Sequence, residues 1–76
     1  MVSKKKINYI HELQDIQRYA VASDYDVGLH SEDGEMIIDA KSYIGMYALD
    51  FTKPILVVSE DTDFHKKIAN IGENVK

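Results

Sequence analysis

The sequence predicts an α+β fold, a two-layer open-faced β-sandwich in which helices cover one face of a four-stranded antiparallel sheet. Two segments repeat apolar residues at helical spacing, and several others alternate as half-buried strands do. The chain has 76 residues and no cysteine, which predicts a single domain over residues 1–76 that is held together by packing rather than by disulfides. The expected element order is β-α-β-β-α-β-α.

The first strand and the first helix are predicted from a change in the spacing of the apolar residues. Residues 5–10 have a strand-like pattern, whereas residues 12–22 carry apolar side chains on one helical face. Those side chains are Leu13, Ile16, Tyr19 and Ala20. The helix is expected to end near Ser23 and Asp24, because short polar side chains compete for the backbone.

A hairpin is predicted next. Tyr25, Val27 and Leu29 alternate with polar residues or glycine, and residues 36–40 supply the partner strand. The pair Asp33-Gly34 lies between them and is a strong hairpin signal.

The second half of the chain predicts a short helix, a central strand and a last helix. Ser42 is a good N-cap for a helix over residues 43–49. Residues 55–58 form an apolar β-branched run that is typical of a central strand. Asp61 or Thr62 caps the last helix, whose apolar face comprises Phe64, Ile68 and Ile71, and Gly72 is expected to end it.

Composition excludes several classes of function. A net charge of −4 argues against nucleic-acid binding. The longest apolar run, residues 43–49, is too short to insert into a membrane. No apolar segment follows Lys4–Lys6, so no secretory signal is predicted and a cytoplasmic location is expected.

No catalytic triad, paired-carboxylate site or phosphate-binding glycine loop is present, so neither an enzyme nor a cofactor is predicted. The acidic residues between Asp24 and Asp39 lack calcium-loop spacing, and no metal site is expected.

Two segments carry a family resemblance. Residues 38–49, Ile-Asp-Ala-Lys-Ser-Tyr-Ile-Gly-Met-Tyr-Ala-Leu, resemble the segment around the regulatory serine of HPr, the histidine phosphocarrier of the bacterial phosphoenolpyruvate:sugar phosphotransferase system. Residues 22–29 are similar to the end of that family's first helix and its second strand. The resemblance implies the fold given above and a role in regulating sugar transport.

His11 is the candidate phosphohistidine, and the only catalytic residue that the resemblance implies. In the family, a histidine at the start of the first helix is followed by alanine, arginine and proline and accepts a phosphoryl group from enzyme I. His11 aligns with that position if this chain lacks two residues that the family has between its first helix and its second strand. Without such a gap, Tyr9 aligns with it instead. Glu12 follows His11, and the arginine and proline are absent. The chain is therefore more similar to HPr-like proteins that lack the active histidine.

Ser42 is the candidate regulatory phosphorylation site. In the family the corresponding serine is phosphorylated by HPr kinase and is then bound by a transcription regulator. At a helix N-terminus the dipole would favour the added negative charge. As an unmodified residue, Ser42 is expected to serve as the N-cap.

The candidate partner-binding surface consists of Tyr43, Ile44, Met46 and Tyr47. A helix of two turns cannot turn all of its large side chains into the core, and an exposed apolar patch usually marks a contact site. The resemblance implies enzyme I, HPr kinase and a transcription regulator as partners, and a homodimer contact is an equal alternative.

These observations predict a regulatory or adaptor relative of the phosphocarrier that acts by protein–protein contact through the Ser42 helix. One alternative is a working carrier that uses His11. Another is a small structural or ligand-binding α+β module unrelated to phosphotransfer.

Overall fold

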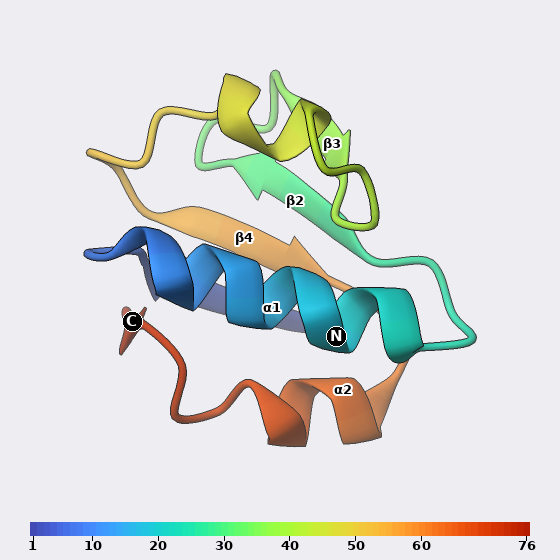
Figure 1. The fold of residues 1–76 in the computed structure, drawn as a ribbon. Helices are drawn as coiled ribbons and strands as arrows, with labels where there is room; N and C mark the ends of the chain where they lie inside the picture. Colours follow the sequence, from blue (N-terminus) through green and yellow to red (C-terminus); the bar gives the residue numbers. More distant parts are fainter.

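The computed structural model describes residues 1–76 and confirms the α+β class (Figure 1). It contains five strands, two α-helices and one 3₁₀-helix, which is labelled η1. In chain order these elements are β1 (Val2–Lys6), α1 (Ile10–Ala22), β2 (Gly28–Ser31), β3 (Ile37–Asp39), η1 (Gly45–Ala48), β4 (Ile55–Val58), α2 (Thr62–Lys67) and β5 (Glu73–Asn74).

The sheet has the order β3-β2-β4-β1-β5, and every neighbouring pair is antiparallel. The predicted central strand is confirmed, because β4 pairs with both β1 and β2. Its apolar residues Ile55 and Val57 are buried, as expected of a strand in the middle of a covered sheet.

The prediction of four strands is wrong, because the chain adds β5 at its end. Helix α2 is short and ends at Lys67. Gly72 then adopts a φ of 72°, which glycine reaches without steric cost, and the chain turns back along β1. Asn74 pairs with Lys5, and the Val75 amide donates to the Lys4 carbonyl at 3.0 Å. Such a two-residue strand has no periodicity of its own to be recognised in the sequence.

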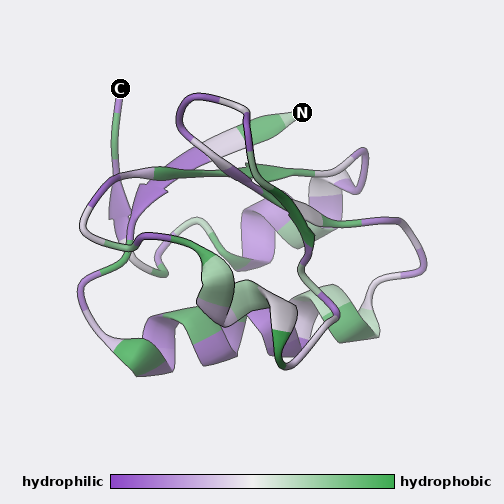
Figure 2. Cartoon of the chain, turned by 90° about the horizontal axis from the view of Figure 1, so that it is seen from above, coloured by the Kyte–Doolittle hydropathy of each residue, from purple (hydrophilic) through white to green (hydrophobic).

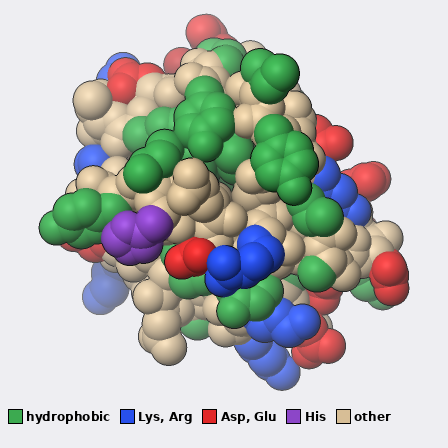
Figure 3. Space-filling model, viewed as in Figure 1, with side chains coloured by type: hydrophobic (Ala, Val, Ile, Leu, Met, Phe, Trp, Pro, Cys, Tyr) green, Lys and Arg blue, Asp and Glu red, His purple; other side chains and the backbone are tan.

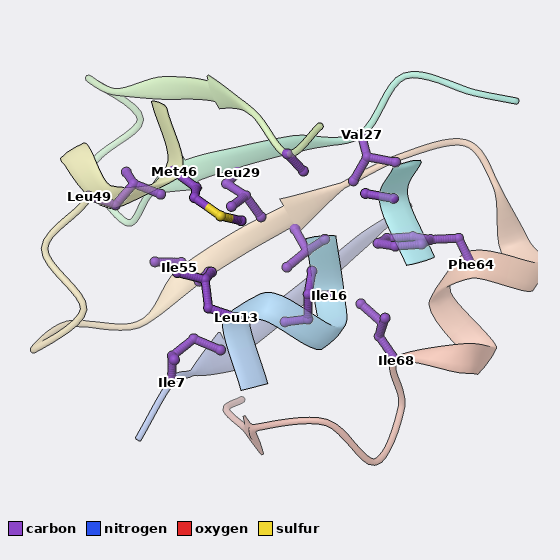
Figure 4. Packing of buried hydrophobic residues seen from close by; sticks show 13 residues of the cluster. Ile7, Leu13, Ile16, Val27, Leu29, Met46, Leu49, Ile55, Phe64 and Ile68 are labelled. Carbon is purple, nitrogen blue, oxygen red and sulfur yellow. The ribbon is translucent and has the colours of Figure 1, made fainter. Parts of the chain in front are cut away.

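All the helices lie on one side of the sheet (Figure 2). The ribbon of α1 carries both hydrophilic and hydrophobic residues along its length, and three of its four buried residues are apolar. The predicted stripe is confirmed, because Leu13, Ile16 and Ala20 are buried. Their side chains meet those of β2, β4, η1 and α2 in one continuous core (Figure 4).

The segment after Ser42 differs from the predicted helix over residues 43–49. Only one turn forms, as the 3₁₀-helix η1, with Ile44 in the N-cap position. A 3₁₀ turn brings side chains three apart onto one side, and so it directs both Met46 and Leu49 into the core. Gly45 lies close to the preceding segment, where an added Cβ would be 3.0 Å from Ser42 Oγ and 3.2 Å from Ile38 Cγ2.

Two buried polar side chains join β1 to α2. Lys5 is almost fully buried, and its Nζ donates to the carbonyls of Ile68 at 2.7 Å and Ala69 at 3.3 Å. His65 is also buried, and its ring nitrogens contact both Ser3 and Ser59. Both of these buried side chains thus have hydrogen-bond partners, as burial in a low-dielectric interior favours.

Candidate functional site

An exposed apolar surface lies around η1 and is visible at the top of Figure 3. We call Tyr43, Ile44 and Tyr47 the η1 surface; their exposed fractions are 71%, 85% and 51%. Scattered exposed apolar residues are common in proteins, but three large ones within five positions form a patch of the kind that marks contact sites. These three residues of the predicted partner-binding surface are therefore placed where a partner could reach them.

Met46 does not belong to that surface, which corrects the prediction. Its side chain is fully buried in the core beside Leu29 and Leu49 (Figure 4). The physical reason is the 3₁₀ geometry of η1, which turns Met46 inward while the next residue, Tyr47, stays exposed.

A groove of about 400 Å³ separates the η1 surface from α1. Tyr43 and Tyr47 line it from one side. From α1 it is lined by Gln14, Gln17, Arg18 and Val21. The sequence prediction did not include these α1 residues, because their proximity to η1 depends on how the two helices pack over the sheet.

Gln17 is the unusual residue of this groove. It lies four positions after Leu13 and three before Ala20, within the stripe that α1 buries, and only 5% of it is exposed. Its side-chain Nε2 is buried without a hydrogen-bond partner. Buried amides are nearly always paired, and a polar residue in an otherwise apolar stripe was the signal in the sequence that could have identified this position.

The groove contains one charged side chain, and its charge is already balanced. Arg18 Nη2 lies 3.1 Å from Asp15 Oδ1, and the guanidinium carbon lies 5.5 Å from the centre of the Tyr19 ring. The groove therefore combines two aromatic rings, an aliphatic side chain and amide groups with little net charge.

Ser42 lies beside the η1 surface and is half-buried. Its Oγ accepts a hydrogen bond from the Gly45 amide at 3.1 Å, so it caps a backbone turn as expected of a serine here. It is not the N-cap of an α-helix, which corrects the prediction. Because η1 is a single turn, the helix dipole expected to favour a phosphate on Ser42 is not formed.

His11 is exposed and is the second residue of α1, whereas Tyr9 occupies the N-cap position. The two rings stack, with centres 5.6 Å apart and planes 14° from parallel. Tyr9 thus lies at the helix start and His11 within the first turn.

The Glu12 carboxylate, next to His11 in the sequence, accepts hydrogen bonds from two backbone amides. Its Oε1 accepts hydrogen bonds from the backbone amides of Asn8 at 2.8 Å and Tyr9 at 3.0 Å. These amides, the Asn8 amide foremost, lower the pKa of the Glu12 carboxyl below its usual value, with a smaller contribution from His11. The amides of the two residues that precede α1 are therefore occupied by a carboxylate and are not free to bind a phosphoryl group.

The acidic hairpin does not assemble a metal site. No group of three His, Cys, Asp or Glu side chains is arranged to hold an ion. The helices are also all too short or too polar to cross a bilayer.

Comparisons of the chain with protein-family models, with curated proteins and with solved structures find no match.

Proposed function

We propose that the protein is a regulatory or adaptor protein that acts by binding other proteins through the η1 surface. The observation that carries this proposal is the exposure of Tyr43, Ile44 and Tyr47 on one turn that the core holds in place through Met46 and Leu49. Burying such aromatic and aliphatic side chains against a partner is favourable, and a rigidly held patch loses little entropy on binding.

The resemblance of residues 38–49 to the regulatory segment of HPr supports partners from the sugar phosphotransferase system. Under this proposal, enzyme I, HPr kinase and an HPr-binding transcription regulator are the proteins to examine. Ser42 is half-buried beside Tyr43, and its phosphorylation would add about −1.5 to −2 charges next to the η1 surface. Phosphorylation would then change which partner binds.

The test compares Ile44→Asp with Ile37→Asp in binding to each purified partner by calorimetry. Ile44 and Ile37 are both largely exposed, but Ile37 lies on the edge strand β3 outside the η1 surface. We expect Ile44→Asp to abolish binding and Ile37→Asp to preserve it. Equal binding by both variants would contradict the proposal.

Incubation with HPr kinase and ATP tests the regulatory site. We expect a phosphate on Ser42 in the wild-type protein and none in Ser42→Ala, as detected by mass spectrometry of the intact chain. Modification elsewhere in the chain would remove the regulatory part of the proposal.

The same surface could instead bind a second copy of the chain. Sedimentation velocity over a range of concentrations distinguishes the two cases. A dimer that dissociates in Ile44→Asp would show that the η1 surface serves self-association.

Phosphohistidine transfer is the less favoured function, because Glu12 places a carboxylate on the amides beside His11. With phosphoenolpyruvate and enzyme I, we expect no acid-labile phosphate on His11. Its appearance, and its loss in His11→Ala, would restore the carrier function.

A further inference from the structure

The turn that joins β2 to β3 contains the pair Asp33-Gly34, and both residues are exposed (Figure 1). Gly34 has a φ of 77°, and a Cβ added to it would meet nothing within 4 Å. Because glycine has no side chain, nothing shields its backbone nitrogen from the carboxyl group of the preceding aspartate. Aspartate followed by glycine is for this reason the pair most prone to react with its own backbone.

The reaction open to this pair is a cyclisation that needs only water. The Gly34 nitrogen forms a bond to Cγ of Asp33, while the bond from Cγ to its hydroxyl oxygen breaks. That hydroxyl leaves as water with the amide hydrogen, and a five-membered succinimide ring remains. Water then opens the ring, and attack at Cγ restores aspartate. Attack at the main-chain carbonyl instead leaves the chain running through Cγ, as isoaspartate of unchanged mass.

The folded turn engages both reacting groups in hydrogen bonds. Oδ1 of Asp33 accepts from the Ser31 hydroxyl at 2.6 Å and from the Glu35 amide at 3.0 Å. The Gly34 amide donates to the Ser31 carbonyl at 2.9 Å. The carboxyl group must leave its two donors, and the Gly34 amide its acceptor, before the ring can close. Cyclisation therefore requires the turn to open.

Ser31 is the residue on which this arrangement depends. Its Oγ accepts from the Met36 amide at 2.9 Å, which orients the hydroxyl that donates to Asp33. The Ser31 hydroxyl, and then the Glu35 amide, lower the pKa of the Asp33 carboxyl below its ordinary 3.8. Only the protonated acid loses its hydroxyl readily as water, so the hydrogen bond from Ser31 also leaves less of the reactive form at neutral pH.

We propose that Asp33 is a site of spontaneous isomerisation to isoaspartate, and that the hydrogen bonds of Ser31 in the folded turn suppress the reaction. The reaction then proceeds mainly in chains whose turn between β2 and β3 has opened. This inference is independent of the proposed function, because it concerns the chemistry of the chain itself.

The modification would act first on the edge strand β3. Isoaspartate adds one carbon to the main chain of the turn, and the length of a turn fixes the register of its hairpin. β3 pairs only with β2, and its Ile38 Cγ2 lies 3.2 Å from where a Cβ on Gly45 of η1 would be. An isomerised turn would therefore disturb the strand that lies beside η1.

The test incubates the full-length protein at neutral pH, once in native buffer and once unfolded in guanidinium chloride. Trypsin releases residues 19–41 as one peptide, in which isoaspartate is quantified by chromatography and located by electron-transfer fragmentation. We expect isoaspartate at Asp33 to form more than about tenfold faster in the unfolded chain, because three hydrogen bonds are lost. Equal rates in the two states, or no isoaspartate at Asp33 in the unfolded chain, would overturn the proposal.

The same peptide supplies internal controls. It contains three further aspartates, each followed by a residue with a side chain that hinders the approach of the backbone nitrogen: Asp24, Asp26 and Asp39. We expect these to isomerise more slowly than Asp33 in guanidinium chloride. Asp33→Glu cannot form the five-membered ring and should give no isomerised product at this position. Isomerisation that is as fast at the other three aspartates would remove the special role of the pair Asp33-Gly34.

Ser31→Ala tests the suppressing residue. We expect this variant to isomerise roughly fivefold faster in native buffer, the effect of about one hydrogen bond, and at the wild-type rate in guanidinium chloride. Ser31→Thr retains the hydroxyl and should stay near the wild type in both. A wild-type rate for Ser31→Ala in native buffer would overturn the role of Ser31.

Ser3→Ala separates local opening of the turn from unfolding of the whole chain. It removes the contact with His65, far from the turn in the sequence, and leaves Ser31 and Asp33 unchanged. We expect Ser3→Ala to isomerise at the wild-type rate in native buffer. An equal acceleration in Ser3→Ala and Ser31→Ala would show that global unfolding controls the reaction and would overturn the local role of Ser31.

Discussion

The hydroxyl of Ser3 lies 2.7 Å from Nδ1 of His65, and this contact joins the first strand to the last helix across 62 positions of the chain. The other ring nitrogen, Nε2, lies 3.0 Å from the Ser59 carbonyl. Because a carbonyl can only accept, Nε2 carries the hydrogen, and Nδ1 accepts from the Ser3 hydroxyl. Both nitrogens of a buried imidazole are thereby paired.

Ser3→Ala should destabilise the fold by about 1–3 kcal/mol, because it leaves Nδ1 of the buried His65 without a partner. Urea unfolding followed by circular dichroism measures the difference. Ser3→Thr retains the hydroxyl on a strand residue and is the control that should stay near wild type. A loss in Ser3→Ala no larger than in Ser3→Thr would show that the contact does not stabilise the fold.

Lys5→Met should destabilise the fold by about 1.5–3 kcal/mol, the range for hydrogen bonds made by a charged group. Methionine keeps the aliphatic stem but cannot donate to the carbonyls of Ile68 and Ala69, which follow α2. Lys66→Met, an exposed lysine on α2, is the matched control and should change stability little. Equal losses in the two variants would contradict the role assigned to Lys5.

The stability of the fold should also depend on Lys5 at alkaline pH. Burial lowers the pKa of the Lys5 amine below its ordinary 10.5, with a smaller opposing effect from Glu12. The unfolded chain therefore holds this proton at a pH where the folded chain has released it, and the contribution of Lys5 to stability increases as pH rises between the two pKa values. The difference in unfolding free energy between wild type and Lys5→Met should therefore grow as pH rises towards the ordinary lysine pKa of 10.5. A difference that shrinks as pH rises would contradict a folded-state pKa of Lys5 below its ordinary value.

Asp61 should contribute to stability above its unfolded-state pKa and lose this contribution in acid. A hydrogen bond from the Ser23 hydroxyl, and then one from the Phe64 amide, lower the pKa of its carboxyl below the ordinary 3.8. The carboxylate caps α2 and contacts the end of α1, so protonation weakens both contacts as pH falls through the folded-state pKa. Asp61→Asn can still accept from the Phe64 amide but does not titrate. Its unfolding midpoint should fall less than that of the wild type between about pH 5 and about pH 2. Parallel acid profiles of the two proteins would exclude this role.

Gln17→Leu should stabilise the free protein by about 1–2 kcal/mol, because it removes a buried amide that lacks a partner and keeps a similar volume. Gln14→Leu is the control on the same side of α1; since Gln14 is exposed, its replacement should change stability by less than about 0.5 kcal/mol. Thermal unfolding measures both. A less stable Gln17→Leu would show that the side-chain amide of Gln17 has a hydrogen-bond partner in solution.

The candidate site was only partly predictable. Exposure of Tyr43, Ile44 and Tyr47 followed from the excess of large side chains on a short segment and is confirmed. The burial of Met46 was not foreseen, because the choice between an α-helix and a 3₁₀ turn depends on contacts with the core. Gln17 was missed although its spacing from Leu13 and Ala20 places it in the buried stripe of α1, and that it lines a groove with Tyr43 and Tyr47 depends on how η1 packs beside α1.

The sequence by itself determined the features that depend on residues close together in the chain. These are the α+β class, the apolar stripe of α1, the central strand β4 and a polar cap at Asp61 or Thr62 for α2, each specified by periodicity or by a side chain within one turn of the backbone. Tertiary structure alone decided what depends on distant residues. The fifth strand requires Asn74 to meet Lys5, and the buried His65 requires Ser3. Such pairings form only when the whole chain closes on one core, because the free energy of burial, and not local propensity, selects them.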